Sequence, residues 1–455
     1  MKKNKLLILL LILISLGISL ILLYYDSEIG TLFLLPLSYS ILTFILLCVI
    51  KNRDIFSSFI FILTLVVLFF RYCLAPYFSI FNDLYVEFGP DPLVSTYFEA
   101  IVIMILELFF CYLITFLISQ HNKFIVESEK CSLLKRKKIL LLLVVPMTLI
   151  LFVMYPSLFK FSVNLDINNF SDETTDYGII SVIFSHLKIL VWLVILSYLS
   201  RLNEKKHKKI YVLIAFIISI ILLASFIDTS RWTVIIMLIL ILFVLKRLFG
   251  KFSKSLVTVT LIFGAIAFIG ISVYKNSYTL QGSDNLLLDT MNTMTMQIDY
   301  YFSGVRNVAQ SLEMQREFDY LITYKTFLND LFGGIPYLNK FFSQYDRVNI
   351  YFNEYNGFSM HRASLIIPMS GIGISYFPYF PYLLTILFTF IAYKLYFLSL
   401  KETKLEFKFI YMYAAVYCAL QWCLNTQSIS FSLLVRVLPV FLLLKLNDYF
   451  SSRRG

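Results

Sequence analysis

Charged residues are scarce in this chain of 455 residues. Asp, Glu, Lys and Arg make up 15% of it, hydrophobic residues make up 59%, and the mean hydropathy is +0.80. This composition excludes a soluble globular protein. A net charge of +11 would favour nucleic acid as the partner of a soluble protein. Here the placement of the basic residues explains the charge instead, so no nucleic-acid partner is expected.

The sequence also lacks the motifs of soluble enzymes. No Walker sequence, GxGxxG, GxSxG or HExxH is present, so an ATP-driven pump or a common type of hydrolase has little support. The six cysteines fall inside apolar runs or in one basic loop, without paired spacing, and predict neither a disulfide framework nor a zinc site. Asp83 and Asp91 are too far apart in sequence to indicate a magnesium site. We therefore expect no metal and no cofactor.

Uncharged apolar runs of about 20 residues, the length that crosses roughly 30 Å of hydrocarbon, recur along the whole chain. The alternating pattern of membrane β-barrel strands is absent, so we expect an all-α polytopic membrane protein. The first run follows MKKNK and lacks an A-x-A-like cleavage site, which favours a retained span over a signal peptide. Twelve spans are predicted, near residues 5–25, 30–50, 55–76, 94–119, 139–157, 179–200, 210–227, 232–246, 256–274, 375–395, 407–426 and 429–446.

The basic residues predict the orientation of these spans. With a cytoplasmic N-terminus, 27 of the 39 Lys and Arg residues fall in cytoplasmic segments, and the short loops on the other face are acidic. The positive-inside rule then places both termini in the cytoplasm.

One connection is much longer than the rest. Residues 275–362 lie on the non-cytoplasmic side, between the ninth and tenth predicted spans, and carry aromatic residues throughout with a break at Gly333 to Pro336. Apolar residues at helical spacing predict two or three short helices that lie on the bilayer surface as a cap. We find no internal repeat and no second soluble domain, so residues 1–455 are expected to form a single membrane domain.

Three arginines within or beside predicted spans are not needed for topology: Arg71, Arg231 and Arg436. An ionisable residue inside a span costs on the order of 2.5–3.5 kcal/mol on insertion scales and usually faces a bundle interior or a watery cavity. Because arginine binds phosphate bidentately, several arginines at similar depth in the outer half favour a diphosphate site that faces outward. The simpler alternative is that each arginine snorkels to the interface, Arg231 by pairing with Asp228.

The long connection adds further candidates. Arg306 and Arg316 fall on predicted helical segments, and the stretch QYDRVNIYFNEY supplies Asp346, Arg347 and Glu354 with aromatic residues between them. Aromatic faces beside amides and carboxylates suit sugar rings, although a packed amphipathic cap would explain the same residues.

The chain re-enters the membrane after this connection. His361 and Arg362 stand at the foot of the apolar run, and Gly371 and Gly373 allow a broken or re-entrant segment there. Non-helical backbone at that depth is tolerated only against protein or a water-filled cavity.

Together these features make the chain resemble the bacterial oligosaccharide repeat-unit polymerases, the O-antigen polymerase family. The resemblance rests on the twelve predicted spans, the long external connection before the last three, and two short motifs. The first motif is Ser230-Arg231 in the outer hairpin DTSRW, and the second is Arg362 followed by Gly373 in HRASLIIPMSGIGIS.

This resemblance implies a C-type glycosyltransferase fold, active at the periplasmic face of the bacterial inner (cytoplasmic) membrane. The nascent glycan would pass from undecaprenyl pyrophosphate to a hydroxyl of the next lipid-linked repeat unit, without a cofactor. The arginines implied in neutralising the departing diphosphate are Arg231, Arg306, Arg362 and Arg436. The candidates for the base are His361, Glu354 and Asp346. The implied partners are lipid-linked oligosaccharides, the lipid bilayer and, secondarily, a chain-length regulator.

Other functions fit the sequence less well. A ligase that joins finished glycan to lipid or protein would share the fold, the long connection and the outer arginines, and stays open as an alternative. A lipid-linked oligosaccharide flippase should show two similar halves with short loops. A solute transporter is disfavoured because paired spans interrupted by Gly or Pro are absent, and a non-catalytic scaffold would not need arginines within spans.

Overall fold

The protein is all-helical in a computed structural model, with no strand among the residues that it describes. Because two compact units are distinguished by their internal contacts, each is described by itself. Unit 1 comprises Met1–Phe124, Met291–Phe397 and Ala415–Phe431, and unit 2 comprises Ile125–Thr290, Leu398–Ala414 and Ser432–Gly455. The described residues are 2–25, 29–50, 55–56, 58–81, 89–121, 146–151, 153–154, 178–206, 208–224, 231–250, 298–335, 338–342, 344–358 and 365–452, with the single residues 258, 289, 293 and 295.

Several helices are suited to a bilayer. Five in the described part of the chain are long and apolar enough to cross a membrane: Asn4–Tyr24, Phe59–Ile80, Val94–Gln120, Leu383–Lys401 and Thr426–Phe450. Helices Leu34–Val49 and Lys209–Leu223 are apolar but shorter. These helices support a membrane protein, whereas the expected count of twelve spans is not confirmed. Two of the predicted spans, 139–157 and 256–274, fall mostly outside the described residues.

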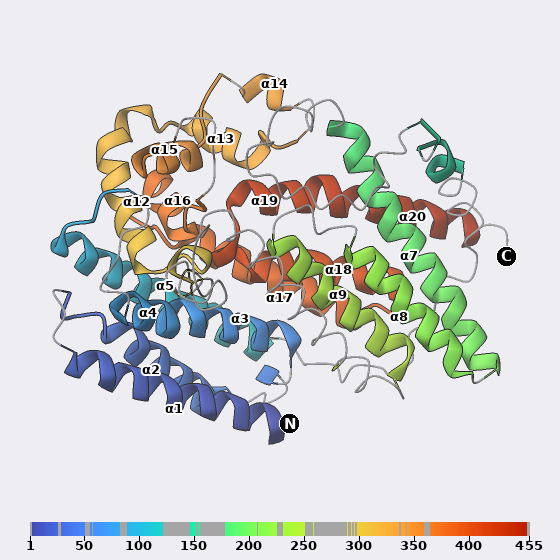
Figure 1. Cartoon of the computed structure of the whole chain (residues 1–455), viewed down its shortest axis with the longest axis horizontal. Helices are drawn as coiled ribbons and strands as arrows, with labels where there is room; N and C mark the ends of the chain where they lie inside the picture. The colour runs from blue at the N-terminus through green and yellow to red at the C-terminus, as the bar shows by residue number, and fades with distance from the viewer. Residues whose placement is uncertain are drawn as a thin grey trace. The chain divides into compact units, whose positions relative to one another are not determined.

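The N-terminal helices of unit 1 pack side by side (Figure 1). Apolar stretches form α1 (Lys2–Tyr24), α2 (Leu34–Val49) and α5 (Val94–His121), and α2 contacts both of the others. Polar side chains pair across these contacts: the Ser15 hydroxyl lies 2.5 Å from that of Ser40, and the Thr43 hydroxyl lies 2.9 Å from that of Tyr112. Between helix pairs in an apolar medium, such hydrogen bonds satisfy groups that would otherwise be left without partners.

A wide turn interrupts the third predicted span. Helix α3 (Phe59–Phe69) passes through the π-helical turn η2 (Phe70–Leu74) into α4 (Ala75–Phe81). Inside an α-helix, a π-turn inserts one residue and is frequently found at functional sites. A second π-turn, η8 (Ser432–Val437), leads from α19 (Thr426–Phe431) towards α20 (Leu438–Ser452).

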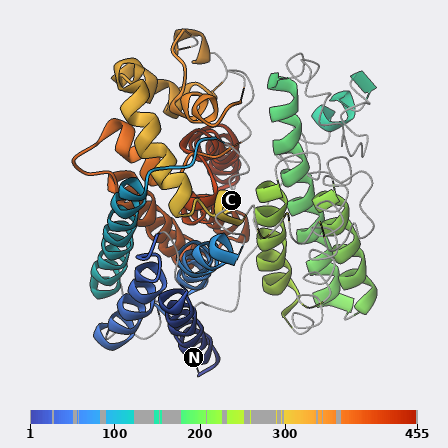
Figure 2. The same cartoon turned by 60° about the vertical axis from the view of Figure 1, so that its left-hand side comes forward.

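The long connection is helical in its described part, as expected, and α12 is largely buried. It contains α12 (Val305–Phe318), η6 (Asp319–Leu321), α13 (Tyr324–Phe332), α14 (Asn339–Phe342) and α15 (Val348–Tyr355). Helix α12 packs against α5, α15 and α16 (Met369–Tyr376), as Figures 1 and 2 also show. Every residue from Val305 to Leu312 is buried, so this part of the connection belongs to the core of unit 1.

Two glycines let α16 pack closely. A Cβ atom at Gly371 would lie 2.4 Å from the Ser311 hydroxyl of α12, and one at Gly373 would lie 1.7 Å from the Pro381 carbonyl oxygen. The helix ends at Tyr376, and α17 (Leu383–Lys401) begins after a non-helical stretch that contains two prolines. The helix is therefore broken after the long connection, but at these prolines and not at Gly371 and Gly373, which lie within α16; the depth of the segment in a bilayer stays a prediction.

Unit 2 is built on α7 (Gly178–Lys206), α8 (Lys209–Ala224) and α9 (Arg231–Leu248). The Trp192 indole N–H of α7 donates to the Ser219 hydroxyl of α8 over 3.0 Å. Helix α18 (Leu405–Ala419) begins in unit 2 and ends in unit 1, where η7 (Gln421–Cys423) follows it.

Candidate functional site

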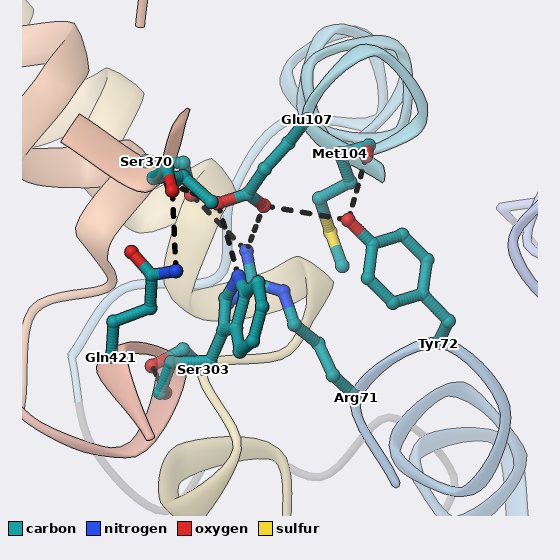
Figure 3. A network of polar contacts seen from close by, with 9 residues as sticks. Arg71, Tyr72, Met104, Glu107, Ser303, Ser370 and Gln421 are labelled. Atoms are coloured by element: carbon teal, nitrogen blue, oxygen red, sulfur yellow. Dashed lines mark hydrogen bonds and ion pairs between the residues drawn. The ribbon is translucent and has the colours of Figure 1, made fainter. Parts of the chain in front are cut away.

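A buried ion pair lies at the centre of the polar core of unit 1. Arg71, on the η2 turn, is 0% exposed, and its Nη2 atom lies 2.8 Å from Oε2 of Glu107 on α5. The same nitrogen donates to the Ser370 hydroxyl at the start of α16 over 3.2 Å. Figure 3 shows the guanidinium group directed at both partners. Arg71 and Glu107 both belong to candidate membrane spans, where an ionised group needs a partner of this kind.

The Glu107 carboxylate also accepts hydrogen bonds from neutral donors. Its Oε1 atom accepts from the Thr385 hydroxyl over 2.7 Å and from the Trp422 indole N–H over 3.3 Å. Its Oε2 atom accepts from the Tyr72 hydroxyl over 3.4 Å as well as from Arg71. A carboxylate is an acceptor only, and here donors from η2, α17 and η7 occupy both of its oxygens.

The network extends to the chain just before α12. The Ser303 hydroxyl donates to the Trp422 carbonyl oxygen over 2.6 Å. The Gln421 side-chain amide donates to the Thr389 hydroxyl over 2.9 Å and to the Thr385 carbonyl oxygen over 3.2 Å. Figure 3 shows Ser303 and Gln421 beside the ion pair. The start of α12 and the broken segment α16–α17 are thereby connected to the same ion pair.

Four buried side chains here have polar atoms without a hydrogen-bond partner in the described structure. They are Nε and Nη1 of Arg71, both carboxylate oxygens of Asp299, both side-chain polar atoms of Asn307, and Oε1 of Gln421. Buried polar atoms are normally paired, so a cluster of unpaired ones indicates a site where water or a ligand binds. One turn further along α12, the Ser311 hydroxyl donates to the Asn307 carbonyl oxygen over 2.6 Å.

Two arginines of this site act on the buried carboxyl of Asp299. Burial raises the pKa of its carboxyl to about 6, while Arg306 and then Arg71 lower it. The backbone N–H groups of Arg306 and Asn307 lower it further, although neither carboxylate oxygen meets hydrogen-bond geometry with them. Arg306 is itself buried, with its guanidinium carbon 5.8 Å from the centre of the Tyr300 ring. Arg71 and Arg306, which are far apart in sequence, thus act on one carboxylate.

The other arginines expected in unit 1 have different surroundings. Arg316 also lies on α12, where its Nη2 atom is 2.7 Å from Oε2 of Glu99, and both side chains are 49% exposed. Arg347, just before α15, donates to the Gln427 side-chain oxygen. The structure therefore directs Arg71 and Arg306 at one carboxylate, Asp299, but gives Arg316 and Arg347 partners of their own.

The remaining candidates are only partly described. Arg436 lies on η8 and Arg231 is the first residue of α9, both in unit 2, and the side chain of Arg231 is not among the described ones. Of the candidate bases, Asp346 is exposed and Glu354 is half-buried on α15. Two predicted site residues lie outside the described residues: His361 and Arg362.

Sequence reasoning missed two members of the site. Glu107 had a usable signal, because it is an acidic residue inside a predicted span and an arginine in a neighbouring span needs a counter-ion. Asp299 had no such signal, since its burial depends on tertiary contacts.

Comparison with known proteins adds no further member of the site: no family model, no curated protein and no solved structure matches the chain. The resemblance to oligosaccharide polymerases stays a prediction from the sequence.

Proposed function

We propose that the protein is a membrane glycosyltransferase that polymerises lipid-linked oligosaccharide repeat units. The growing glycan is transferred from undecaprenyl pyrophosphate to a hydroxyl of the next unit at the periplasmic face. The single observation that carries the proposal is the pair of buried arginines beside Asp299. Arg71 comes from a candidate membrane span and Arg306 from the long connection, so a lipid headgroup and its glycan would meet at this junction.

The chemistry of the leaving group explains why guanidinium groups are needed. When the glycosidic C–O bond to the diphosphate breaks, the bonding electrons leave with the phosphate oxygen, and its negative charge must be stabilised. Preorganised cationic donors in an enclosed site provide this stabilisation, and the loss of one donor typically costs about 10²–10³ in rate. Two nitrogens of Arg71 have no partner within the described residues and are available to phosphate oxygens.

The network around Glu107 adds support through geometry. The Arg71 guanidinium is held by Glu107 of α5 and Ser370 of α16. Donors from α17 and η7 in turn hold the Glu107 carboxylate. Side chains fixed in this way lose little entropy when a ligand binds. A surface arginine such as Arg316 lacks this fixation.

Complementation tests the proposal. The chain is expressed in a bacterial host that lacks its own surface-polysaccharide polymerase, and the glycan is separated by length on a gel. We expect a ladder of repeat units from the unaltered chain and, because the departing diphosphate loses a cation, at least about a 10²-fold loss of polymer from Arg306→Gln. Arg201→Gln, the same substitution at an exposed position of α7, should leave the ladder intact.

Two outcomes would contradict the proposal. Absence of a ladder with the unaltered, membrane-inserted chain would refute polymerase activity, and rescue of a ligase-deficient host would identify the alternative. An undiminished ladder from Arg306→Gln, at equal protein level, would remove the buried arginines from the mechanism.

A further inference from the structure

Asp299 occupies an unusual backbone position. It lies in the helical turn 298–301, and the chain then reverses at Ser303, which has a φ of +52°. The Gly304 N–H donates to the Asp299 carbonyl oxygen over 2.7 Å. A Cβ atom at Gly304 would lie 1.8 Å from Oδ1 of Asp299, so only glycine lets the carboxylate lie this close to the first turn of α12.

The surroundings of this carboxylate combine burial with positive charge. Asp299 is 4% exposed, and its two oxygens have no hydrogen-bond partner in the described part of the chain. Three titratable groups interact electrostatically with Asp299: Arg306 of α12, Arg71 of η2 and Tyr97 of α5. The hydroxyl of Tyr97 donates to Asp91 over 3.1 Å. Asp299 therefore retains unused lone pairs next to two cations.

Three other described carboxylates in unit 1 differ from it in a way that matters for proton transfer, whereas Oε2 of Glu354 on α15 is also buried without a hydrogen-bond partner. Glu107 accepts hydrogen bonds at both oxygens. Asp330 accepts from the Tyr376 hydroxyl and, over 3.4 Å, from the Val348 N–H. Asp346 is exposed to solvent. Asp299 is buried, unpaired and close to the arginines expected to hold the leaving group.

We propose that Asp299 is the general base that accepts the proton of the attacking sugar hydroxyl, an inference that rests on the proposed function. The hydroxyl oxygen forms a bond to the anomeric carbon of the donor glycan, and the bond from that carbon to the diphosphate oxygen breaks. The bonding electron pair leaves with the diphosphate, beside Arg306 and Arg71, and the hydroxyl proton passes to the Asp299 carboxylate. The products are the elongated glycan and the lipid diphosphate, and the protonated Asp299 later returns its proton to water.

The electrostatics of the site suit this role. A base works best when its pKa is near the working pH. Burial brings the pKa of Asp299 to about 6, and the two arginines prevent a larger rise. The carboxyl is then mostly ionised at neutral pH, yet basic enough to take a proton.

The test uses the Asp299→Asn variant of the full chain in membranes, supplied with lipid-linked repeat units extracted from the polymerase-deficient host. We expect kcat/KM to fall by about 10²–10⁴, the usual contribution of a general base. The unaltered enzyme should lose activity tenfold per pH unit below about 6, and the variant should lack this acid limb. Asp319→Asn is the matched control, because Asp319 is exposed on the same connection and accepts a hydrogen bond from the Gln315 side chain, away from the arginines.

Each result decides the assignment. If the unaltered chain polymerises and Asp299→Asn does so at a similar rate with the same acid limb, Asp299 is not the base, although the proposed function stands. If the unaltered chain makes no polymer at all, both proposals fail. Should the variant fold poorly, the pH profile of the unaltered enzyme still decides, since the absence of an acid limb near pH 6 overturns the assignment.

Discussion

The ion pair between Arg71 and Glu107 gives a quantitative prediction about stability. Both side chains are essentially inaccessible to solvent, with exposures of 0% and 1%. Removal of one partner leaves the other charge buried and alone, which costs about 3–5 kcal/mol, whereas removal of both is often close to neutral. We therefore expect Arg71→Met and Glu107→Gln each to lower the free energy of unfolding by about 3–5 kcal/mol.

In the double variant, the free energy of unfolding should fall by far less than the sum of the losses in the two single variants. The amide that Glu107→Gln introduces would still present an oxygen to the Thr385 and Trp422 donors, so the hydrogen bonds now made to Oε1 survive. We expect a coupling energy of at least about 3 kcal/mol, the upper end of measured pair couplings, because the second substitution removes the charge that the first one leaves alone. The measurement is a double-mutant cycle of unfolding in mixed detergent micelles, followed by circular dichroism.

A second cycle on the same α5 helix provides the control. Arg316 and Glu99 form an ion pair of similar length, 2.7 Å, but each side chain is 49% exposed. Eight residues of helix, about 12 Å of axial rise, separate Glu99 from Glu107. The exposed pair should couple by about 0–1 kcal/mol. Equal coupling at the two sites, or additive losses at the buried one, would refute the argument that burial decides the energy.

Two further predictions concern local stability. Burial raises the pKa of the Asp330 carboxyl to about 6 from 3.8, so the folded state binds the proton more tightly than the unfolded state. The free energy of unfolding should therefore fall by about 2–3 kcal/mol as the pH rises from 3.8 to about 6. Asp330→Asn should make the free energy of unfolding, measured at several pH values, less dependent on pH, and an unchanged dependence would show that Asp330 is not its cause. Gly373→Ala should destabilise the protein by about 1–3 kcal/mol in thermal unfolding, because the new methyl group would overlap the Pro381 carbonyl oxygen at 1.7 Å. Gly17→Ala in α1, where nothing lies within 4 Å of the added carbon, should be neutral or stabilising, and equal losses at both glycines would show that close packing is not the cause.

The apolar runs predicted several helices well because hydrophobicity alone decides which segments cross a bilayer. The run 94–119 corresponds to α5 (Val94–His121), and 5–25 to α1 (Lys2–Tyr24). The run 375–395 was expected to be one helix, but its first residues belong to α16 and the FPYFPY sequence then interrupts it. Proline breaks a helix without making the sequence less apolar, so the hydropathy pattern concealed the break.

Charge in an apolar context predicted part of the site. Arg71 was identifiable because a cation within a span requires an interior partner, and the structure supplies one in Glu107. The proximity of Arg71, Arg306 and Asp299 was not predictable from spacing. It arises because Phe70, beside Arg71, stacks on Phe302 with ring centres 4.7 Å apart, a contact between segments that no local pattern connects.

The two π-turns have a shared consequence for how such a site can change. Each contains one of the arginines in a candidate span, Arg71 in η2 and Arg436 in η8. A single surplus residue in the helical winding offsets everything on one side of it by about 100° relative to the other. Deletion of one residue from Phe70–Leu74 would turn this stretch into ordinary α-helix. Residues on one side of the deletion would then rotate relative to those on the other, so the Arg71 guanidinium group and the apolar faces of α3 and α4 would not all keep their present orientations. The length of this helix is therefore constrained as tightly as the identity of any side chain on it.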